Sequence, residues 1–333
     1  MRFEQISIDK GLSQNIVECI LQDSRGFMWF GTEDGLNQFD GYNFKIYKED
    51  YNNANSLGHD NILSVIEDRN GVFWIGTFHG GLTSYDPGRK KFTQFKRDPS
   101  NPGSLSNNVI RTIYEDRSGT IWFGTDNGLN RFDKEKMSFK HFFSDTKDPN
   151  SLSSNQIYAI TEDKSGSLWI GTRGGGLNQF NRQTEKFTRY QAEPDVPGKL
   201  NHNDIFTIFE DRSGTLWIGT DGGGLNRFVR EDNSFVVFDN DQNDPDSISN
   251  NHVRVIFEDQ SGQMWIGTNL GLNKFDRANE NFIHYMNDPN DLNSLSNNEV
   301  RSIYEDKSGV LWIGTYGGGI NKYIGKTKKF VHY

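Results

Sequence analysis

The chain has 333 residues, with 36 lysines and arginines against 45 aspartates and glutamates, and a formal net charge of −9. This negative charge argues against a general attraction to nucleic acid or to an anionic membrane surface. We expect no membrane insertion and no leader, because no run of about 18 apolar residues occurs and the N-terminus lacks a signal-peptide pattern. The single cysteine, Cys19, excludes an internal disulfide and a cysteine-based zinc site.

The first predicted element is a short strand at residues 3–6 with a Phe-x-x-Ile pattern. Phenylalanine followed three residues later by an aromatic or aliphatic residue recurs at seven later places, the last being Phe330 and Tyr333. The seven repeats described below need one such strand each, so one copy is surplus. We expect residues 1–8 to supply the closing outer strand of the last repeat. Residues 325–333 are then a surplus strand that leads into further domains, and the chain is part of a longer protein.

The rest of the chain is one unit repeated seven times, and each copy carries one tryptophan. The tryptophans lie 45 to 48 residues apart and are Trp29, Trp74, Trp122, Trp169, Trp217, Trp265 and Trp312. In the best-formed unit the expected strands cover residues 108–116, 121–125, 128–133 and 139–142. Repeats of this length with one aromatic residue per unit are typical of β-propeller blades. We therefore predict an all-β fold over residues 1–333, a single seven-bladed β-propeller with four antiparallel strands per blade.

Two features indicate that the repeats share one geometry. The turn after the first strand has aspartate at its first position and glycine at its fourth in every unit, as in Asp116 and Gly119, which is typical of a tight type I turn. The link between units has twelve residues in all six internal cases. A sheet of four short strands cannot bury both faces alone, so each blade must pack on two neighbours. We assign the tryptophans to this packing.

Residues that differ between the repeats are not required by the shared fold and are therefore candidates for function. They lie eleven and thirteen residues before each tryptophan, near the start of the innermost strand, and four or five residues after it, in the second turn. In a propeller these positions share one face and surround one mouth of the central channel. The candidate ligand-binding residues are Arg111, Arg254, Arg301, Arg173, Tyr158, Phe206, Phe78, His79, Asp126, Asp221, His252 and Tyr316.

The residue types at this mouth predict a binding site for a small molecule or an oligosaccharide, including acidic ones. Arginine holds carboxylates and sulfates with two hydrogen bonds, and aromatic rings stack on sugar rings. The alternative is that acidic neighbours neutralise the arginines and leave a paired channel without a ligand. Those acidic residues are Glu18, Asp126, Asp221 and Glu299.

We predict no catalytic residues, metal site or cofactor. The repeated Glu-Asp pairs, such as Glu67 and Asp68, precede the first turn on the opposite face and are assigned to turn formation. His79 and His252 lie on the candidate face, but no third ligand has the spacing that a metal requires. No acid/base pair can be placed, which counts against a second candidate function, a lyase acting at the same mouth. A third candidate is a protein-interaction scaffold that uses the rim or face of the disc.

The repeat resembles the two-component regulator propeller repeat. Residues 208–226 read Ile-x-Glu-Asp-x-x-Gly-x-x-Trp-Ile-Gly-Thr-x-x-Gly-Gly-Leu-Asn, and residues 11–15 and 30–37 are similar to the opening blade of such sensors. Seven such matches cover essentially the whole chain. The resemblance implies the periplasmic or otherwise extracytoplasmic sensor region of a bacterial hybrid histidine kinase or of a diguanylate cyclase. Such sensors are often tuned to oligosaccharides released from polysaccharides.

The resemblance also implies parts that residues 1–333 do not contain. Members of the family typically carry a second propeller, a small β-sandwich, a membrane helix and a kinase domain. We therefore expect downstream domains of the same protein as partners, a kinase or cyclase output outside this chain, and no enzyme activity in this region. A homodimer of the full-length protein is compatible with this arrangement.

Overall fold

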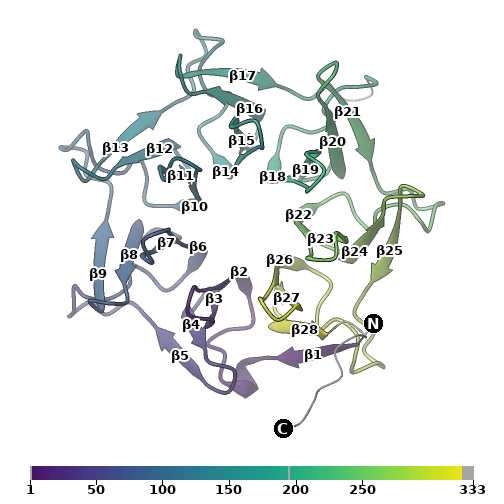
Figure 1. Ribbon diagram of the computed structural model, residues 1–333, viewed down its shortest axis with the longest axis horizontal. Coiled ribbons are helices and arrows are strands. Elements are labelled where there is room, and N and C mark those ends of the chain that lie inside the picture. Colours follow the sequence, from purple (N-terminus) through teal and green to yellow (C-terminus); the bar gives the residue numbers. More distant parts are fainter. Residues whose placement is uncertain (1, 194–195, 325–333) are drawn as a thin grey trace.

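Seven four-stranded antiparallel sheets surround a central axis in this protein. The structure is a computed structural model that describes residues 2–193 and 196–324. Figure 1 shows the sheets as the blades of a closed disc, which confirms the predicted seven-bladed β-propeller. The described residues include one 3-10 helix, η1 (Ile8–Lys10), and none of their helices is long and apolar enough to cross a membrane.

The four strands of a blade follow one another from the axis of the disc to its rim. Blade 1 contains β2 (Val17–Gln22), β3 (Met28–Thr32), β4 (Gly35–Phe39) and β5 (Phe44–Tyr47); blade 2 contains β6 (Ile62–Glu67), β7 (Phe73–Thr77), β8 (Leu82–Asp86) and β9 (Lys91–Phe95). Blade 3 contains β10 (Ile110–Glu115), β11 (Ile121–Thr125), β12 (Gly128–Asp133) and β13 (Ser138–Phe142); blade 4 contains β14 (Ile157–Glu162), β15 (Leu168–Thr172), β16 (Gly176–Asn181) and β17 (Lys186–Tyr190). Blade 5 contains β18 (Ile205–Glu210), β19 (Leu216–Thr220), β20 (Leu225–Val229) and β21 (Ser234–Phe238); blade 6 contains β22 (Val253–Glu258), β23 (Met264–Thr268), β24 (Gly271–Asp276) and β25 (Asn281–Tyr285). Blade 7 contains β26 (Val300–Glu305), β27 (Val310–Thr315), β28 (Ile320–Ile324) and β1 (Phe3–Ile6).

Blade 7 therefore takes strands from two distant parts of the chain. Its outermost strand, β1, pairs antiparallel with β28 and places Phe3 opposite Tyr323. The ring closes at this seam through the hydrogen bonds of one strand pair and the packing of its side chains. The predicted surplus strand at 325–333, with Phe330 and Tyr333, lies outside the described residues.

The hydrophobic core lies between the blades. Trp122 of blade 3, for example, packs in one cluster with Leu152, Ile157 and Phe180 of blade 4. All seven tryptophans are at most 5% exposed. A buried aromatic side chain of this size contributes about 2–3 kcal/mol, so this packing is the main attraction between neighbouring blades.

The glycine of each Trp-x-Gly-Thr string sets the distance between blades. A Cβ atom at Gly171 would lie 2.6 Å from Ile205 Cγ2 in the next blade and 3.2 Å from the Ala159 Cβ atom. The equivalent glycines of the other blades meet the next innermost strand equally closely. Any larger residue at this position would push two blades apart.

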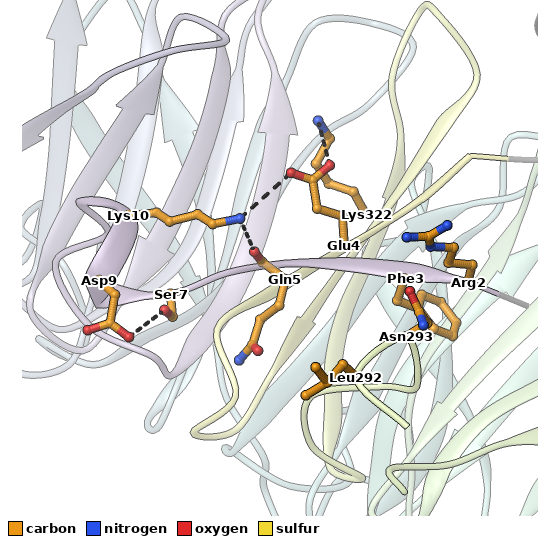
Figure 2. Close-up of a pocket in the computed structure, with 10 residues that line it drawn as sticks. All are labelled: Arg2, Phe3, Glu4, Gln5, Ser7, Asp9, Lys10, Leu292, Asn293 and Lys322. Atoms are coloured by element: carbon orange, nitrogen blue, oxygen red, sulfur yellow. Dashed lines mark hydrogen bonds and ion pairs between the residues drawn. The ribbon is translucent and has the colours of Figure 1, made fainter. Parts of the chain in front are cut away.

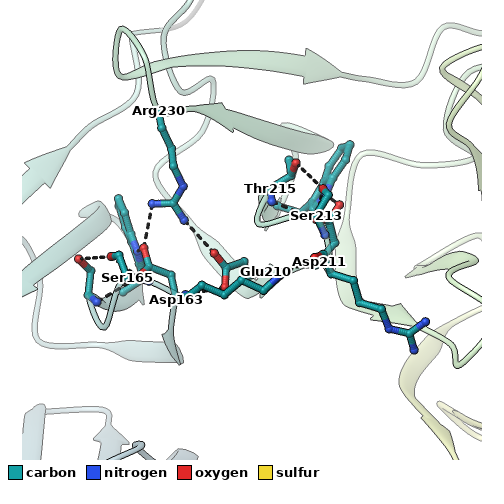
Figure 3. A network of polar contacts seen from close by, with 12 residues as sticks. Asp163, Ser165, Glu210, Asp211, Ser213, Thr215 and Arg230 are labelled. Atoms are coloured by element: carbon teal, nitrogen blue, oxygen red, sulfur yellow. Dashed lines mark hydrogen bonds and ion pairs between the residues drawn. The ribbon is translucent and has the colours of Figure 1, made fainter.

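A repeated polar network holds the face that carries the first turn of each blade. Asp163 Oδ2 accepts the Trp169 indole N–H at 2.8 Å. Arg230 of the next blade binds both Asp163 at 2.8 Å and Glu210 at 3.0 Å (Figure 3). Equivalent links join blades 3 and 4 through Arg182 and blades 5 and 6 through Arg277. The repeated Glu-Asp pairs therefore belong to the turns and to the contacts between blades.

A second set of contacts on this face runs from blade to blade around the ring. Glu210 accepts the backbone N–H of Lys164 from the preceding blade at 2.7 Å, and Lys164 Nζ donates to the Asp211 carbonyl at 3.3 Å. Between blades 7 and 1, Lys307 Nζ donates to the carbonyl oxygens of Asp23 and Ser24 at 3.1 and 3.2 Å. These contacts give one face of the disc the same construction in successive blades.

Candidate functional site

Seven side chains, one from each blade, line a cavity on the propeller axis. Its volume is about 140 Å³. Each lining residue lies eleven positions before a tryptophan and is the second residue of an innermost strand. The lining residues are Glu18, Leu63, Arg111, Tyr158, Phe206, Arg254 and Arg301.

A β-bulge places each of these residues. In blade 3, Ile110 pairs with Thr125 and Thr112 pairs with Gly124, so Arg111 between them is left out of the ladder. The same register shift occurs at the equivalent residue of the other six blades. A bulge re-aims the side chain of its extra residue, here toward the axis. The alternation of side chains along a strand, used in the sequence analysis, did not predict the bulge.

Arginine and aromatic side chains contact one another along one side of the cavity. The Arg111 guanidinium lies 5.7 Å from the Phe78 ring centroid and 4.9 Å from that of Tyr158. The Tyr158 and Phe206 rings meet edge to face at 5.0 Å, and Arg254 lies 4.3 Å from the Phe206 centroid. These cation–π and aromatic contacts form a continuous wall from blade 2 to blade 6.

Two of the cavity arginines are held by polar partners from neighbouring turns. Arg111 makes a bidentate contact with Asp126, from Nε at 2.7 Å and from Nη2 at 2.9 Å. Arg254 donates from Nε to Asn269 Oδ1 at 2.7 Å, and its Nη2 lies 3.6 Å from Asp221 Oδ1. For these two arginines the structure has the paired arrangement that the sequence analysis left open as an alternative.

Arg301 is less completely satisfied. It forms an ion pair with Glu299 and lies 4.8 Å from the Tyr316 ring centroid. Its Nε atom is buried and has no hydrogen-bond partner among the residues that the structure describes. One N–H group of Arg301 is therefore buried without a partner beside the cavity.

Seven of the twelve candidate residues do not line the cavity, and they are Phe78, His79, Asp126, Arg173, Asp221, His252 and Tyr316. Three of the seven are exposed side chains at the rim of the mouth. Arg173 and His79 are exposed, and Tyr316 is 41% exposed. All three belong to turns between the second and third strands of their blades. The structure thus separates the candidates into residues that line or contact the axial cavity and exposed residues at its rim.

Charges at the cavity are closely balanced. Burial raises the pKa of the Glu18 carboxyl, and nearby Arg301 opposes this effect. Burial lowers the pKa of Arg254, and the positive charge of Arg301 lowers it further. Within residues 2–193 and 196–324, no three histidine, cysteine or acidic side chains are grouped as a metal site requires.

The structure contains one acid/base pair that the sequence analysis did not place. His252 Nδ1 lies 2.6 Å from Asp221 Oδ1, and the two residues also form a backbone bridge between blades 6 and 5. The statement that no such pair can be placed is therefore wrong. The pair forms because the second turn of blade 5 lies beside the start of the innermost strand of blade 6. A comparison of equivalent positions in the repeats does not show which positions of neighbouring blades are in contact.

A larger cavity, of about 670 Å³, lies away from the mouth, along β1 at the seam. Figure 2 shows Lys10 there, donating to the Gln5 carbonyl at 2.8 Å and lying 3.7 Å from Glu4, with Leu292 across the groove. Leu292 is 94% exposed. We place the candidate site at the smaller axial cavity because side chains from all seven blades converge only there among the described cavities.

A model of the family described as two component regulator propeller matches one segment in each blade. The matched segments are residues 11–34, 56–79, 104–127, 151–174, 199–222, 247–270 and 294–317, together about half of the chain. The histidine kinase P4 of Formosa agariphila is 46% identical over 55 residues, which are 16% of this chain and 4% of that protein.

Two solved structures show how widely this fold is used. The extracellular domain of the hybrid two component system BT3049 from B. thetaiotaomicron is 30% identical, with a TM-score of 0.83 over 96% of this chain and 41% of its own. The virginiamycin B lyase from Staphylococcus aureus is 14% identical, with a TM-score of 0.70 over 96% of this chain and 98% of its own. The likeness to the lyase shows the fold alone. This chain spans less than half the length of the sensor structure that it matches.

Proposed function

Because this chain belongs to the two-component regulator propeller family, we propose that it is the ligand-binding part of a sensor in a bacterial two-component system. One observation carries the proposal: side chains that differ from blade to blade converge at one mouth, whereas the opposite face repeats the same contacts. The region binds and does not catalyse. It lies outside the cytoplasm, as does the extracellular domain to which it is similar. The output domains, and any contacts that make the full protein a homodimer, lie in other parts of that protein.

The ligand is an oligosaccharide that lies across the mouth. The axial cavity of about 140 Å³ has the volume of roughly five water molecules, so only one substituent of a sugar can enter it. The exposed rim offers the Tyr316 ring for stacking and Arg173 for a carboxylate, and the unpartnered N–H of Arg301 lies inside. These features support binding of neutral sugars and leave a place for an acidic group.

Titration calorimetry with neutral and acidic oligosaccharides tests this proposal. Xylo-, manno- and galacto-oligosaccharides represent the neutral class, and oligogalacturonates represent the acidic one. We expect Tyr316→Ala and Arg301→Ala to weaken binding at least tenfold, because about 1.4 kcal/mol of stacking or of charged hydrogen bonding is lost. Lys164→Ala, on the opposite face, is the control and keeps the wild-type affinity. Binding of no member of the panel, or equal affinity in all variants, would contradict the proposal.

The His252 and Asp221 pair favours a second candidate, a lyase at the same mouth. An imidazole oriented by a carboxylate can remove a proton from a substrate. Incubation with oligogalacturonates, followed by ultraviolet absorbance of an unsaturated product, separates the two candidates. Product that forms with the wild-type protein and not with His252→Ala would favour the enzyme.

A further inference from the structure

The turn between β7 and β8 differs from its counterparts at one backbone position. Blades 2, 4, 5 and 7 have a second turn that is one residue longer than in the other blades. In three of them the second turn residue is a glycine with positive φ: 78° at Gly174, 119° at Gly222 and 98° at Gly317. Blade 2 has His79 at this position, with a φ of 80°.

Packing does not explain the histidine. A residue with a Cβ atom adopts this left-handed conformation at a cost that glycine avoids. A Cβ atom would have no neighbour within 4 Å at Gly174 and would meet only a side chain at 3.5 Å at Gly222 and at 3.9 Å at Gly317, so no close packing at the equivalent positions requires a side chain. Five other non-glycine residues with positive φ, Lys90, Met137, Glu185, Asn233 and Glu280, lie in the outer turns between the third and fourth strands, so His79 is the one found at the mouth among the described residues. A residue held in this region beside a candidate site is a candidate for function.

A fixed support holds the His79 ring at the mouth. The His79 and Phe78 ring centroids are 4.1 Å apart. Phe78 is anchored on its other sides, because its N–H donates to the Asn61 carbonyl at 3.0 Å and Arg111 lies 5.7 Å from its ring. His79 itself is exposed, and its ring nitrogens make no hydrogen bond within residues 2–193 and 196–324.

The surroundings of His79 favour a ligand without charge. Arg111 is the cation that contacts Phe78 in this turn, and two of its N–H groups are already bound to Asp126. An imidazole can donate and accept a hydrogen bond, and a sugar hydroxyl can do the same. The two aromatic rings add an apolar surface of the kind on which a sugar ring packs.

We propose that His79 is a ligand-contacting residue that determines specificity at this mouth, with its imidazole hydrogen-bonded to a hydroxyl of a neutral sugar ring. This inference rests on the proposed function and adds to it the residue and the class of sugar. The turn with positive φ then presents an imidazole ring at the mouth, where the other three turns have a glycine without a side chain.

His79→Gly tests the inference, because it should change stability and binding in opposite directions. Glycine accepts the positive φ, so we expect the melting temperature to rise by about 1–2 °C. The affinity for the neutral oligosaccharides that the wild-type protein binds should fall at least tenfold. His79→Asn, which tolerates a left-handed backbone and keeps a hydrogen-bonding group, should retain part of the affinity. Gly174→His is the matched stability control and should lower the melting temperature by a similar amount.

The outcomes separate this inference from the proposed function. Unchanged sugar affinity in His79→Gly would overturn the inference and leave the proposed function intact. Binding of no oligosaccharide by the wild-type protein would overturn both. Binding restricted to oligogalacturonates would overturn the assignment of a neutral sugar. Loss of binding together with a lower melting temperature would show that His79 holds the turn and does not contact the ligand, which also contradicts the inference.

Discussion

Replacing Asp211 by asparagine measures how much the network on the first-turn face contributes to stability. The buried Asp211 carboxylate accepts the Trp217 indole N–H at 3.0 Å, the Thr215 backbone N–H at 3.0 Å and the Arg277 guanidinium at 2.7 Å. Asparagine has one oxygen and would direct its NH₂ group at some of these donors. Arg277 comes from the next blade and also binds Glu258, so the substitution weakens a contact between two blades.

The pKa of Asp211 allows this contribution to be estimated. Burial alone would raise the pKa, but hydrogen bonds from Ser213, Trp217 and Arg277 outweigh it and lower the pKa to about 2. The difference from the usual value of 3.8 corresponds to about 2 kcal/mol. Because the folded-state pKa is the lower one, this stability is present above about pH 4 and is lost as the pH falls toward 2. About 1 kcal/mol of it is lost by pH 3.

Urea unfolding followed by tryptophan fluorescence at pH 7 and pH 3 provides the assay. We expect Asp211→Asn to lower the free energy of unfolding by about 2–4 kcal/mol at pH 7 and by about 1 kcal/mol less at pH 3. Asp259→Asn is the matched control, since Asp259 accepts the Trp265 indole N–H at 2.8 Å but has no arginine partner in the described parts of the chain. Equal losses for the two variants, or a loss for Asp211→Asn that does not change with pH, would refute the reasoning.

Further predictions concern the blade contacts, the seam and the cysteine. Gly171→Ala should lower the free energy of unfolding by about 1–3 kcal/mol, because its Cβ atom would collide with Ile205, whereas Gly88→Ala on the surface should change it little; thermal unfolding compares the two. Phe3→Ala should lower the free energy of unfolding by about 3–5 kcal/mol, because Phe3 is 5% exposed and its ring packs against Tyr323 where blade 7 is completed. An unchanged midpoint of urea unfolding would contradict this. Cys19 is half-buried, and desolvation raises the pKa of its thiol to about 12, so a colourimetric thiol reagent should react with it much more slowly in the native protein than in the unfolded one; equal rates would contradict this expectation.

The sequence was sufficient to predict the fold because the same local chemistry occurs in every repeat. Asp163 and Gly166 form the same turn in blade 4 as Asp211 and Gly214 in blade 5, and the tryptophan after each turn packs in the gap between its own blade and the next one. Repetition thus replaces the alignment of relatives that is usually needed to distinguish framework from variable positions.

The candidate site was only partly predictable. Comparison of the repeats placed Arg111 and Tyr158 at one axial opening, and both line the axial cavity, but the β-bulge that aims them there was not predicted. The bidentate contact of Arg111 with Asp126 depends on side-chain rotamers, and the approach of His252 to Asp221 depends on how two blades are placed. The positive φ of His79 is visible in the sequence only as a missing glycine.

The bulges on the innermost strands separate recognition from folding. A bulge residue such as Arg111 or Leu63 has no partner residue in the strand pairing, so exchanging its side chain disturbs no cross-strand side-chain pair. Seven such positions surround the axial cavity, one in each blade, so a substitution in a single blade can change the ligand preference. The disc can therefore diversify in what it detects while its architecture stays the same.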